Sequence, residues 1–304
     1  MKTQEIIILD GGMGRELERI GAPFQQPEWS AQALMETPHL VSQVHNSFMQ
    51  AGAEVITINT YALVPFHIGQ QRFEQQGASL IRQAAQLAKQ AAATHNEAST
   101  SPLVAGCIPP VLGSYRPDLF NIEQAAPLLE VLITQQQEYV DIWIAETISS
   151  IAEAEIIKQR TSNTSQKTWM AFTINDDLTA TPKLRSGELV SDAVTRIAGE
   201  NVTAILFNCS RIEVMESALT IAKQALVSKG LEQQVRLGVY ANNFPPIGDR
   251  HAANNQVNSI RNDIPATQYR EFAEKWLHAG ASIIGGCCGI SPEHIRELAK
   301  LKSK

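Results

Sequence analysis

The sequence is poor in cysteine and contains no long apolar segment, and each shortage excludes a class of protein. Four cysteines in 304 residues, two of them adjacent, do not form the disulfide framework of a secreted protein. No run approaches the roughly eighteen apolar residues of a membrane-spanning helix, and Ile6–Leu9 is too short for the core of a secretion signal. We therefore expect a cytoplasmic protein whose thiols are reduced.

Basic clusters and flexible linkers are also missing. The formal net charge is −6, and the 25 Lys and Arg residues form no cluster that would bind nucleic-acid phosphates. No Gly- and Ser-rich segment divides the chain, and its composition, 44% hydrophobic and 18% charged, is typical of globular proteins. We expect residues 1–304 to form one domain that binds neither nucleic acid nor membranes. The oligomeric state stays open.

Eight short apolar runs, each followed by a segment with apolar residues at helical spacing, predict the fold. The expected strands are Ile6–Leu9, Val55–Thr60, Leu103–Ile108, Asp141–Ala145, Trp169–Ile174, Thr203–Cys209, Val235–Tyr240 and Ser282–Cys287. The expected helices are Arg15–Ile20, Leu40–Gln50, Gln70–Thr94, Glu123–Tyr139, Ile151–Arg160, Ser191–Ala198 with Ser191 as its cap, Val214–Ser228, Tyr269–His278 and Glu293–Leu301. A long loop is expected over 242–265. This alternation is typical of an α/β protein folded as a closed (β/α)8 TIM barrel, and a doubly wound open sheet is the alternative.

Polar and sulfur-bearing residues occur where the predicted strands end. The active sites of such barrels lie at the carboxyl ends of the strands. In this sequence those positions hold Asp10, Glu146, Asn175, Asn208, Cys209, Cys287 and Cys288. We expect these side chains to converge at one mouth of the barrel.

The stretch Ser282–Ser291 (SIIGGCCGIS) combines an apolar run with glycines and two adjacent cysteines. The glycines allow the backbone to bend so that Cys287 and Cys288 converge on one point, and Cys209 supplies a third thiol from another strand end. Three thiolates with one open position form a catalytic zinc pattern, since a structural zinc normally takes four protein ligands. The alternative is three buried, unreactive cysteines. A disulfide between the adjacent pair is a poorer possibility, because bridge geometry does not suit neighbours.

Zinc held by three thiolates would favour a soft ligand. A substrate thiol at the open position would lose its proton at neutral pH, and alkylation of that sulfur is the natural reaction. Asp10 and Glu146 could hold an amino group, and backbone N–H groups near Gly11 and Gly12 could meet a carboxylate. The alternative for each carboxylate is a solvated loop residue.

Six motifs, spread over nearly the whole chain, resemble those of one family. They are DGGMGRELE (Asp10–Glu18), EWSA (Glu28–Ala31), NTY (Asn59–Tyr61), AET (Ala145–Thr147), NCS (Asn208–Ser210) and GGCCGISPEHI (Gly285–Ile295). In these motifs the sequence is similar to the zinc-dependent homocysteine S-methyltransferases. The resemblance implies a (β/α)8 barrel that makes methionine, with zinc on Cys209, Cys287 and Cys288 and with homocysteine near Asp10, Gly11, Gly12 and Glu146.

Two segments depart from the branch of that family that uses S-methylmethionine as methyl donor. Residues Ala105–Leu119 lack a Gly-Pro-Tyr-Gly run, and Tyr240–Asn243 resembles that branch's Tyr-Pro-Asn only in part. A donor for sulfur carries a positive onium centre, which aromatic faces attract. Trp29 and Tyr61 are the candidates, and a packing role is the alternative for each. We expect S-methylmethionine, because no nucleotide-binding glycine loop is visible for S-adenosylmethionine; betaine and dimethylsulfoniopropionate stay open.

Two other functions are alternatives, and the length of the sequence disfavours the first of them. A partner that feeds methyl groups to cobalamin would place this barrel beside folate and cobalamin modules, for which 304 residues leave no room. A non-enzymatic zinc store or redox sensor would need only the cysteines. Cys107 matches no ligand position, and we expect it to be a small core residue.

Overall fold

The structure, a computed structural model, describes residues 5–95, 101–246 and 259–303. These residues form an eight-stranded parallel sheet in the order β1-β8-β7-β6-β5-β4-β3-β2. The strands are β1 (Ile7–Ile8), β2 (Val55–Thr57), β3 (Leu103–Ile108), β4 (Ile142–Ile148), β5 (Lys167–Phe172), β6 (Val202–Arg211), β7 (Arg236–Asn242) and β8 (Ile283–Ile284). The first four residues, and part of the expected loop over 242–265, lie outside the described residues.

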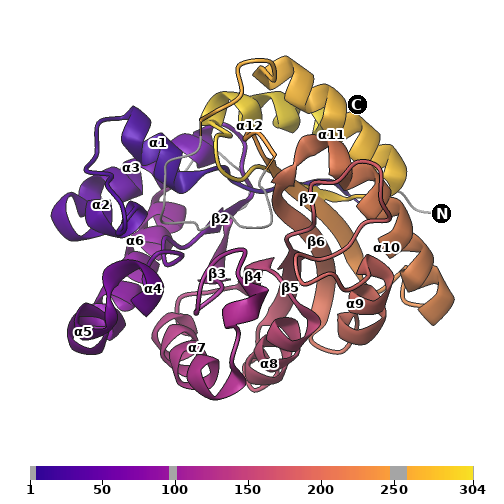
Figure 1. The fold of residues 1–304 in the computed structure, drawn as a ribbon. Coiled ribbons are helices and arrows are strands. Elements are labelled where there is room, and N and C mark those ends of the chain that lie inside the picture. The colour runs from indigo at the N-terminus through magenta and orange to yellow at the C-terminus, as the bar shows by residue number, and fades with distance from the viewer. Residues whose placement is uncertain (1–4, 96–100, 247–258, 304) are drawn as a thin grey trace.

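The sheet closes into a barrel between β1 and β2. Leu9 pairs with Val55 in a parallel bridge, the Glu54 N–H donates to the Ile8 carbonyl at 2.8 Å, and the Asp10 N–H donates to the Val55 carbonyl at 3.0 Å. Figure 1 shows the helices arranged around the central strands. The predicted (β/α)8 TIM barrel is confirmed, and the open sheet is excluded because its edge strands would not bond to each other.

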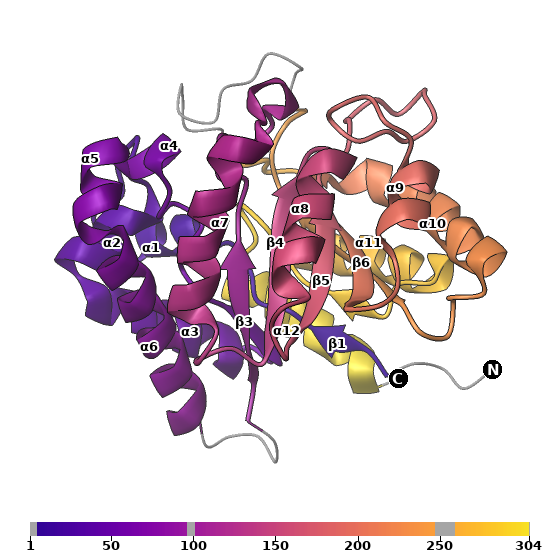
Figure 2. The ribbon, with the colours of Figure 1, turned by 90° about the horizontal axis from the view of Figure 1, so that it is seen from below.

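Helices cover the outer surface of the barrel. The α-helices are α1 (Met13–Arg19), α2 (Ser30–Glu36), α3 (Pro38–Gln50), α4 (Pro65–Ile68), α5 (Gln70–Arg72), α6 (Ala78–Thr94), α7 (Ile122–Gln136), α8 (Ile151–Thr161), α9 (Val190–Ile197), α10 (Met215–Lys229), α11 (Ala266–Ala279) and α12 (Pro292–Ala299). In Figure 2 strands β3 and β4 rise toward the same end of the barrel. Within the described ranges no helix is long and apolar enough to span a membrane, and the cytoplasmic location stays a prediction.

Two short helices and one interruption differ from the sequence-based expectation. Helices α2 and α4 have only seven and four residues, too few turns for an apolar stripe to indicate a helix. The expected helix Gln70–Thr94 is divided, because a π-helical turn at Phe73–Gly77 separates α5 from α6. Gly69, with a φ of 79°, ends α4 just before α5 begins.

The prediction that Ser191 caps its helix is wrong. Helix α9 begins at Val190, and its N-cap is Leu189, so Ser191 lies inside the first turn. The chain enters the helix through an antiparallel bridge between Lys183 and Leu189, which places the start before Ser191. The helix boundary was therefore set by a contact outside the helix rather than by a capping side chain.

Side chains along each strand alternate between the barrel interior and the layer beneath the helices. In β4, Ile142 and Ile144 belong to the interior cluster, whereas Trp143 and Ala145 pack under the helices. Glu146 continues the inward series at the carboxyl end of β4. This alternation brings its carboxyl group to the mouth of the barrel.

Candidate active site

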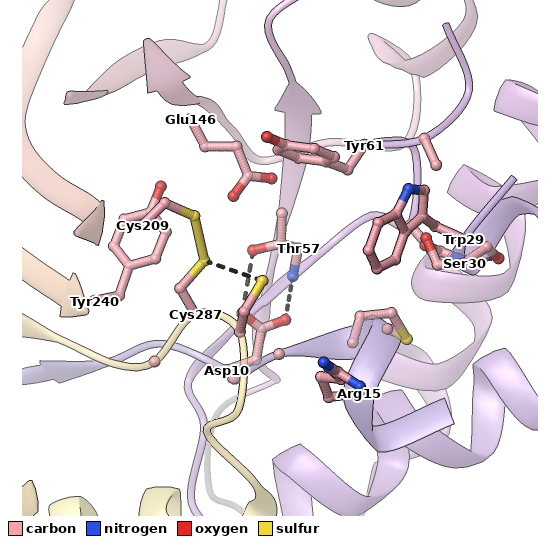
Figure 3. A pocket seen from close by; sticks show the side chains of 18 of the residues that line it. Asp10, Arg15, Trp29, Ser30, Thr57, Tyr61, Glu146, Cys209, Tyr240 and Cys287 are labelled. Atoms are coloured by element: carbon pink, nitrogen blue, oxygen red, sulfur yellow. Dashed lines mark hydrogen bonds between the residues drawn. A yellow bond between two sulfur atoms is a disulfide. The ribbon is translucent and has the colours of Figure 1, made fainter. Parts of the chain in front are cut away.

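A cavity lies at the carboxyl ends of the strands, and most of the predicted site residues line it (Figure 3). Those residues are Asp10, Gly11, Gly12, Trp29, Tyr61, Glu146, Cys209, Cys287 and Cys288. The closed barrel is what joins them, since they come from the ends of β1, β2, β4, β6 and β8 and from the turn before α2. Asn175 and Asn208, which we also expected to bind substrate, are not among the described residues that line the cavity.

Three sulfur atoms lie together in this cavity. The Sγ atoms of Cys209, Cys287 and Cys288 are all within 4.8 Å of one another. Cys209 and Cys287 form a disulfide, and Cys288 Sγ lies 4.0 Å from Cys287 Sγ. Two sulfurs joined in a disulfide are not thiolates, so a metal requires the reduced protein. When reduced, the three cysteines form the soft donor set that suits zinc with one position left for a ligand.

The Asn208 side chain ties the ends of β4 and β6 together. Thr147 and Cys209 have φ values of 61° and 49°, which L-residues rarely adopt, and each lies where its strand loses regular register. Asn208 Oδ1 accepts from the Thr147 N–H at 2.9 Å, and its Nδ2 donates to Thr147 Oγ1 at 3.0 Å. Asn208 is fully buried, and it supports the two strained residues beside Glu146 instead of facing the cavity.

Asn175 belongs to a hairpin that follows β5. Its N–H donates to the Lys183 carbonyl at 2.9 Å, and its Oδ1 accepts from the Asp177 N–H at 3.0 Å. Ile174 pairs with Leu184 in an antiparallel bridge of the same hairpin. Because the chain continues past the strand end as a hairpin, the position after β5 does not bring Asn175 to the cavity.

The two glycines after Asp10 allow two loops to approach each other. A Cβ atom on Gly12 would lie 2.7 Å from the Cys287 carbonyl oxygen, and one on Gly11 would lie 2.5 Å from the Ile290 carbonyl oxygen. The Gly12 N–H donates to the Ile290 carbonyl at 2.9 Å. That N–H is thus bonded within the protein, so Gly12 does not supply the expected carboxylate-binding N–H, and the expectation for Gly11 stays a prediction. The glycines instead bring the Asp10 loop against the cysteine loop.

Asp10 and Glu146 are two carboxyl groups that share the cavity. Thr57 holds Asp10, because its N–H donates to Oδ2 at 2.7 Å and its hydroxyl to Oδ1 at 3.2 Å. Burial is the main reason that the pKa of each carboxyl is raised to about 7, and the charge of Glu146 adds to the rise in the pKa of Asp10. A bound ammonium group would favour the charged form of both. The pair therefore suits a ligand that carries an amino group.

Cys107 is buried as expected, and it also contacts Glu146. Its Sγ donates to Glu146 Oε1 at 2.9 Å. Burial, followed by the charge of Glu146, raises the pKa of the Cys107 thiol well above its usual range, so the thiol keeps its proton and acts as a donor. The Cys107 N–H in turn donates to Gln136 Oε1 at 3.0 Å, which fixes this part of β3 to α7. Cys107 thus holds one oxygen of Glu146 in place.

Aromatic rings form another part of the cavity wall. The rings that line it include those of Phe24, Trp29, Tyr61, Tyr115 and Phe244. Phe24 meets Trp29 edge to face with ring centroids 5.4 Å apart, and the Tyr61 hydroxyl lies 2.7 Å from Ser114 Oγ. Rings fixed in this way attract a cation without forming an ion pair with it.

Sequence analysis did not identify Arg15, Thr57, His67 and Tyr240 as residues that line the cavity. Tyr240 ends the seventh expected strand, and this position alone could have indicated it. Its hydroxyl is buried and has no hydrogen-bond partner in the part of the chain that the structure describes, so a ligand can supply one. Arg15 and His67 lie in helices after β1 and β2. The spacing of apolar residues in a helix does not show which of its polar side chains face a cavity.

Comparisons with known proteins agree with this arrangement. A family model described as homocysteine S-methyltransferase matches residues 7–301. Homocysteine S-methyltransferase from Escherichia coli (strain K12) is 28% identical, over 98% of this chain and 96% of the relative. Selenocysteine Se-methyltransferase from Brassica oleracea var. italica is 27% identical, over 98% of this chain and 89% of the relative.

Solved structures are similar over the same extent. The crystal structure of the homocysteine methyltransferase MmuM from Escherichia coli in its metallated form has a TM-score of 0.77 at 28% identity, over 98% of this chain and 96% of the other. Its oxidized form has a TM-score of 0.78 at 26% identity with the same coverage. This chain belongs to the homocysteine S-methyltransferase family.

Proposed function

We propose that this enzyme transfers a methyl group from S-methylmethionine to the sulfur of L-homocysteine, giving methionine, with a zinc ion held by Cys209, Cys287 and Cys288. Residues 1–304 act as one domain in this proposal. The observation that carries it is the joining, in one cavity, of three sulfur atoms, two carboxyl groups with raised pKa, and several aromatic rings. In this proposal the sulfur atoms hold the zinc that binds the acceptor thiol, the carboxyl groups bind the acceptor ammonium, and the aromatic rings attract the positive centre of the donor.

Asp10 and Glu146 bind the ammonium group of homocysteine in this proposal. Both carboxyl groups are poorly solvated, so an ammonium ion restores the favourable interactions that burial removes. Thr57 and Cys107 fix one or both oxygens of these groups and leave the rest of each carboxylate for the ligand. A zinc ion on the cysteines would keep the homocysteine sulfur as a thiolate at neutral pH.

The methyl transfer itself is a displacement at carbon. The thiol of homocysteine first releases its proton to solvent water, and the sulfur then attacks the methyl carbon of the donor. A new S–CH3 bond forms while the bond from that methyl to the onium sulfur breaks, and its electron pair stays on the donor sulfur as a neutral thioether. The protein's contribution is to align the two reactants and to stabilise the onium until it reacts.

Replacing Trp29 with alanine should weaken donor binding. A cation next to an aromatic face gains about 0.5 to 2 kcal/mol per ring, so we expect the KM for the donor to rise about 2- to 30-fold. Trp29→Phe keeps an aromatic ring, so its KM for the donor should lie between those of the wild type and Trp29→Ala. Steady-state kinetics with varied donor will measure this, and an unchanged KM for every donor tried would remove Trp29 from the donor site.

Cys107 offers a test of how Glu146 is positioned. Cys107→Ala removes the hydrogen bond to Glu146 Oε1, whereas Cys107→Ser keeps a donor at the same place. We expect the KM for homocysteine to rise about 3- to 10-fold in the alanine variant, with kcat and zinc content nearly unchanged, and to recover in the serine variant. The same KM for homocysteine in Cys107→Ala and Cys107→Ser would show that this contact does not position Glu146.

A panel of methyl donors tests the proposed function directly. Reduced, zinc-loaded protein is mixed with homocysteine and with S-methylmethionine, betaine, dimethylsulfoniopropionate or S-adenosylmethionine, and methionine is quantified. We expect S-methylmethionine to give the highest kcat/KM. The close approach of the three cysteine sulfurs also suits a second candidate, a thiol redox sensor. Absence of methionine with every donor, together with reversible zinc loss on oxidation, would support the sensor instead.

A further inference from the structure

Tyr240, near the carboxyl end of β7, has a hydroxyl group that the fold leaves without a partner. The residue is 5% exposed, and its ring belongs to the apolar cluster inside the barrel. Among the described residues that line the cavity, it is the only one whose side chain carries a buried oxygen atom with no hydrogen-bond partner. Buried polar groups are normally bonded, and an unpaired one destabilises the protein. The hydroxyl therefore marks a place where a ligand supplies the missing bond.

The Tyr240 hydroxyl belongs to the same part of the cavity as the two carboxyl groups. In Figure 3 Tyr240 and Glu146 lie on the side of the cavity away from Trp29. Burial raises the pKa of the Tyr240 hydroxyl well above its usual range, the charge of Glu146 is the next largest cause, and the charge of Asp10 contributes as well. The phenol therefore stays neutral, and its oxygen lies in the field of both carboxylates.

These two carboxyl groups decide what kind of ligand group is favourable beside Tyr240. They repel an anion where water is scarce, so the carboxylate of a ligand is unfavourable there. They attract a cation, and the phenol oxygen has lone pairs that accept hydrogen bonds from N–H groups. A hydroxyl adds an acceptor to such a site without adding a third negative charge. The surroundings of Tyr240 therefore suit an ammonium group.

The number of N–H groups in an ammonium ion supports the same ligand. A primary ammonium has three N–H donors, and the proposed acceptor site offers two carboxyl groups, those of Asp10 and Glu146. Protein donors already use part of each group, because Thr57 bonds to both oxygens of Asp10 and Cys107 bonds to Oε1 of Glu146. When each carboxyl group accepts one N–H, the third N–H still lacks an acceptor. The buried oxygen of Tyr240 is suited to accept it.

We infer that the Tyr240 hydroxyl accepts the third N–H of the homocysteine ammonium, so that oxygen atoms of Asp10, Glu146 and Tyr240 together select an acceptor with a primary amine. This inference rests on the proposed function, and it adds a binding residue at the acceptor site. The ammonium takes no part in the bonds that form and break, so the contact is the same before and during methyl transfer. Tyr240 therefore contributes to the affinity for homocysteine and not to the rate of the transfer step.

The test uses three thiols that differ in the charged groups they carry. Homocysteine has both the ammonium and the carboxylate, homocysteamine has only the ammonium, and γ-mercaptobutyrate has only the carboxylate. Each is titrated calorimetrically into reduced, zinc-loaded full-length protein. The variants are Tyr240→Phe and, as a matched control, Tyr139→Phe, which removes the same atom from a half-buried ring that does not line the cavity.

In Tyr240→Phe we expect homocysteine and homocysteamine to bind about tenfold or more weakly than in the wild type, because a hydrogen bond to a charged group is lost. The affinity for γ-mercaptobutyrate should stay within about twofold of that of the wild type. Tyr139→Phe should match the wild type with all three thiols. Zinc content, and kcat at saturating homocysteine, should be nearly unchanged in both variants. Without a ligand, Tyr240→Phe should unfold at an equal or higher temperature than the wild type, because the hydroxyl has no partner within the described ranges.

Three results would overturn the inference. The first is weaker binding of γ-mercaptobutyrate but not of homocysteamine, which assigns the hydroxyl to the carboxylate. The second is an equal loss of affinity for all three thiols, or a loss of zinc, which assigns it to the sulfur atoms. The third is unchanged affinity for every thiol. Failure of the proposed function is a separate result, because methionine would then be missing from the wild-type assay while the calorimetric comparison still decides the role of Tyr240; a wild type that does not bind homocysteine would overturn both.

Discussion

Replacing Cys209, Cys287 or Cys288 with alanine is expected to lower kcat by at least about a thousandfold and to reduce zinc from about one ion per chain to a small fraction. Two remaining thiolates cannot complete the donor set that the three sulfurs form within 4.8 Å of one another. The measurement is zinc content of protein purified under reducing conditions, followed by methyl-transfer assays at saturating substrate. Cys107→Ser is the matched control, because Cys107 is the fourth cysteine and should keep a full zinc complement.

The same variants should remain folded. The barrel has a small apolar core inside the strands and a much larger one beneath the helices, and neither depends on the cysteine loop for most of its contacts. Circular dichroism of the variants, and of wild type treated with a chelator, should therefore match that of the zinc-loaded protein. Stoichiometric zinc in all three variants would contradict the ligand assignment. Unfolding on chelation would show that the metal also supports the fold.

Replacing Glu146 with glutamine is expected to raise the KM for homocysteine about a hundredfold, with zinc content unchanged. The charge that pairs with the ammonium is lost from a poorly solvated site, and removing one partner of such a pair costs on the order of 2 to 5 kcal/mol. Steady-state kinetics with varied homocysteine will measure this. Glu153→Gln is a useful comparison, because Glu153 also has a pKa raised to about 7 by burial but binds the Ser149 N–H outside the cavity. An unchanged KM in Glu146→Gln would remove this residue from the acceptor site.

The raised pKa of Glu146 also gives the sign of two pH effects. An ordinary glutamate has a pKa of about 4.3 when unfolded, and Glu146 has one of about 7 in the folded protein. The folded state thus binds more protons between these values, so the free energy of unfolding falls as pH rises from about 4 to 7. Above pH 7, Glu146→Gln should unfold at an equal or higher temperature than wild type. Homocysteine binding should strengthen as pH rises through 7, because both carboxyl groups become charged, and this change should be smaller in the variant.

The hydrophobic pattern was sufficient to predict the barrel. Strand β3 has the bounds that its apolar run indicated, Leu103–Ile108, and the order of strands and helices follows from their alternation along the chain. The same pattern located the carboxyl strand ends, and hence Glu146 and the cysteines, because a closed parallel barrel brings all such ends to one mouth. The limits of the pattern are visible at α2, α4 and α9, where short length or an external contact decides the helix.

What the sequence by itself determined is the fold class and the set of reactive side chains, because periodicity and strand ends are properties of local order. Which of these side chains meet was decided only by the tertiary structure. Asn208 lies at the same strand end as Cys209. Its side chain nevertheless bonds to Thr147, 61 positions away in the sequence, and does not line the cavity as Cys209 does. Cys107 shows no local signal, and its contact with Glu146 appears only in the folded barrel. The physical reason is that such contacts depend on barrel closure and on irregular backbone at the strand ends, which arise between segments distant in the chain.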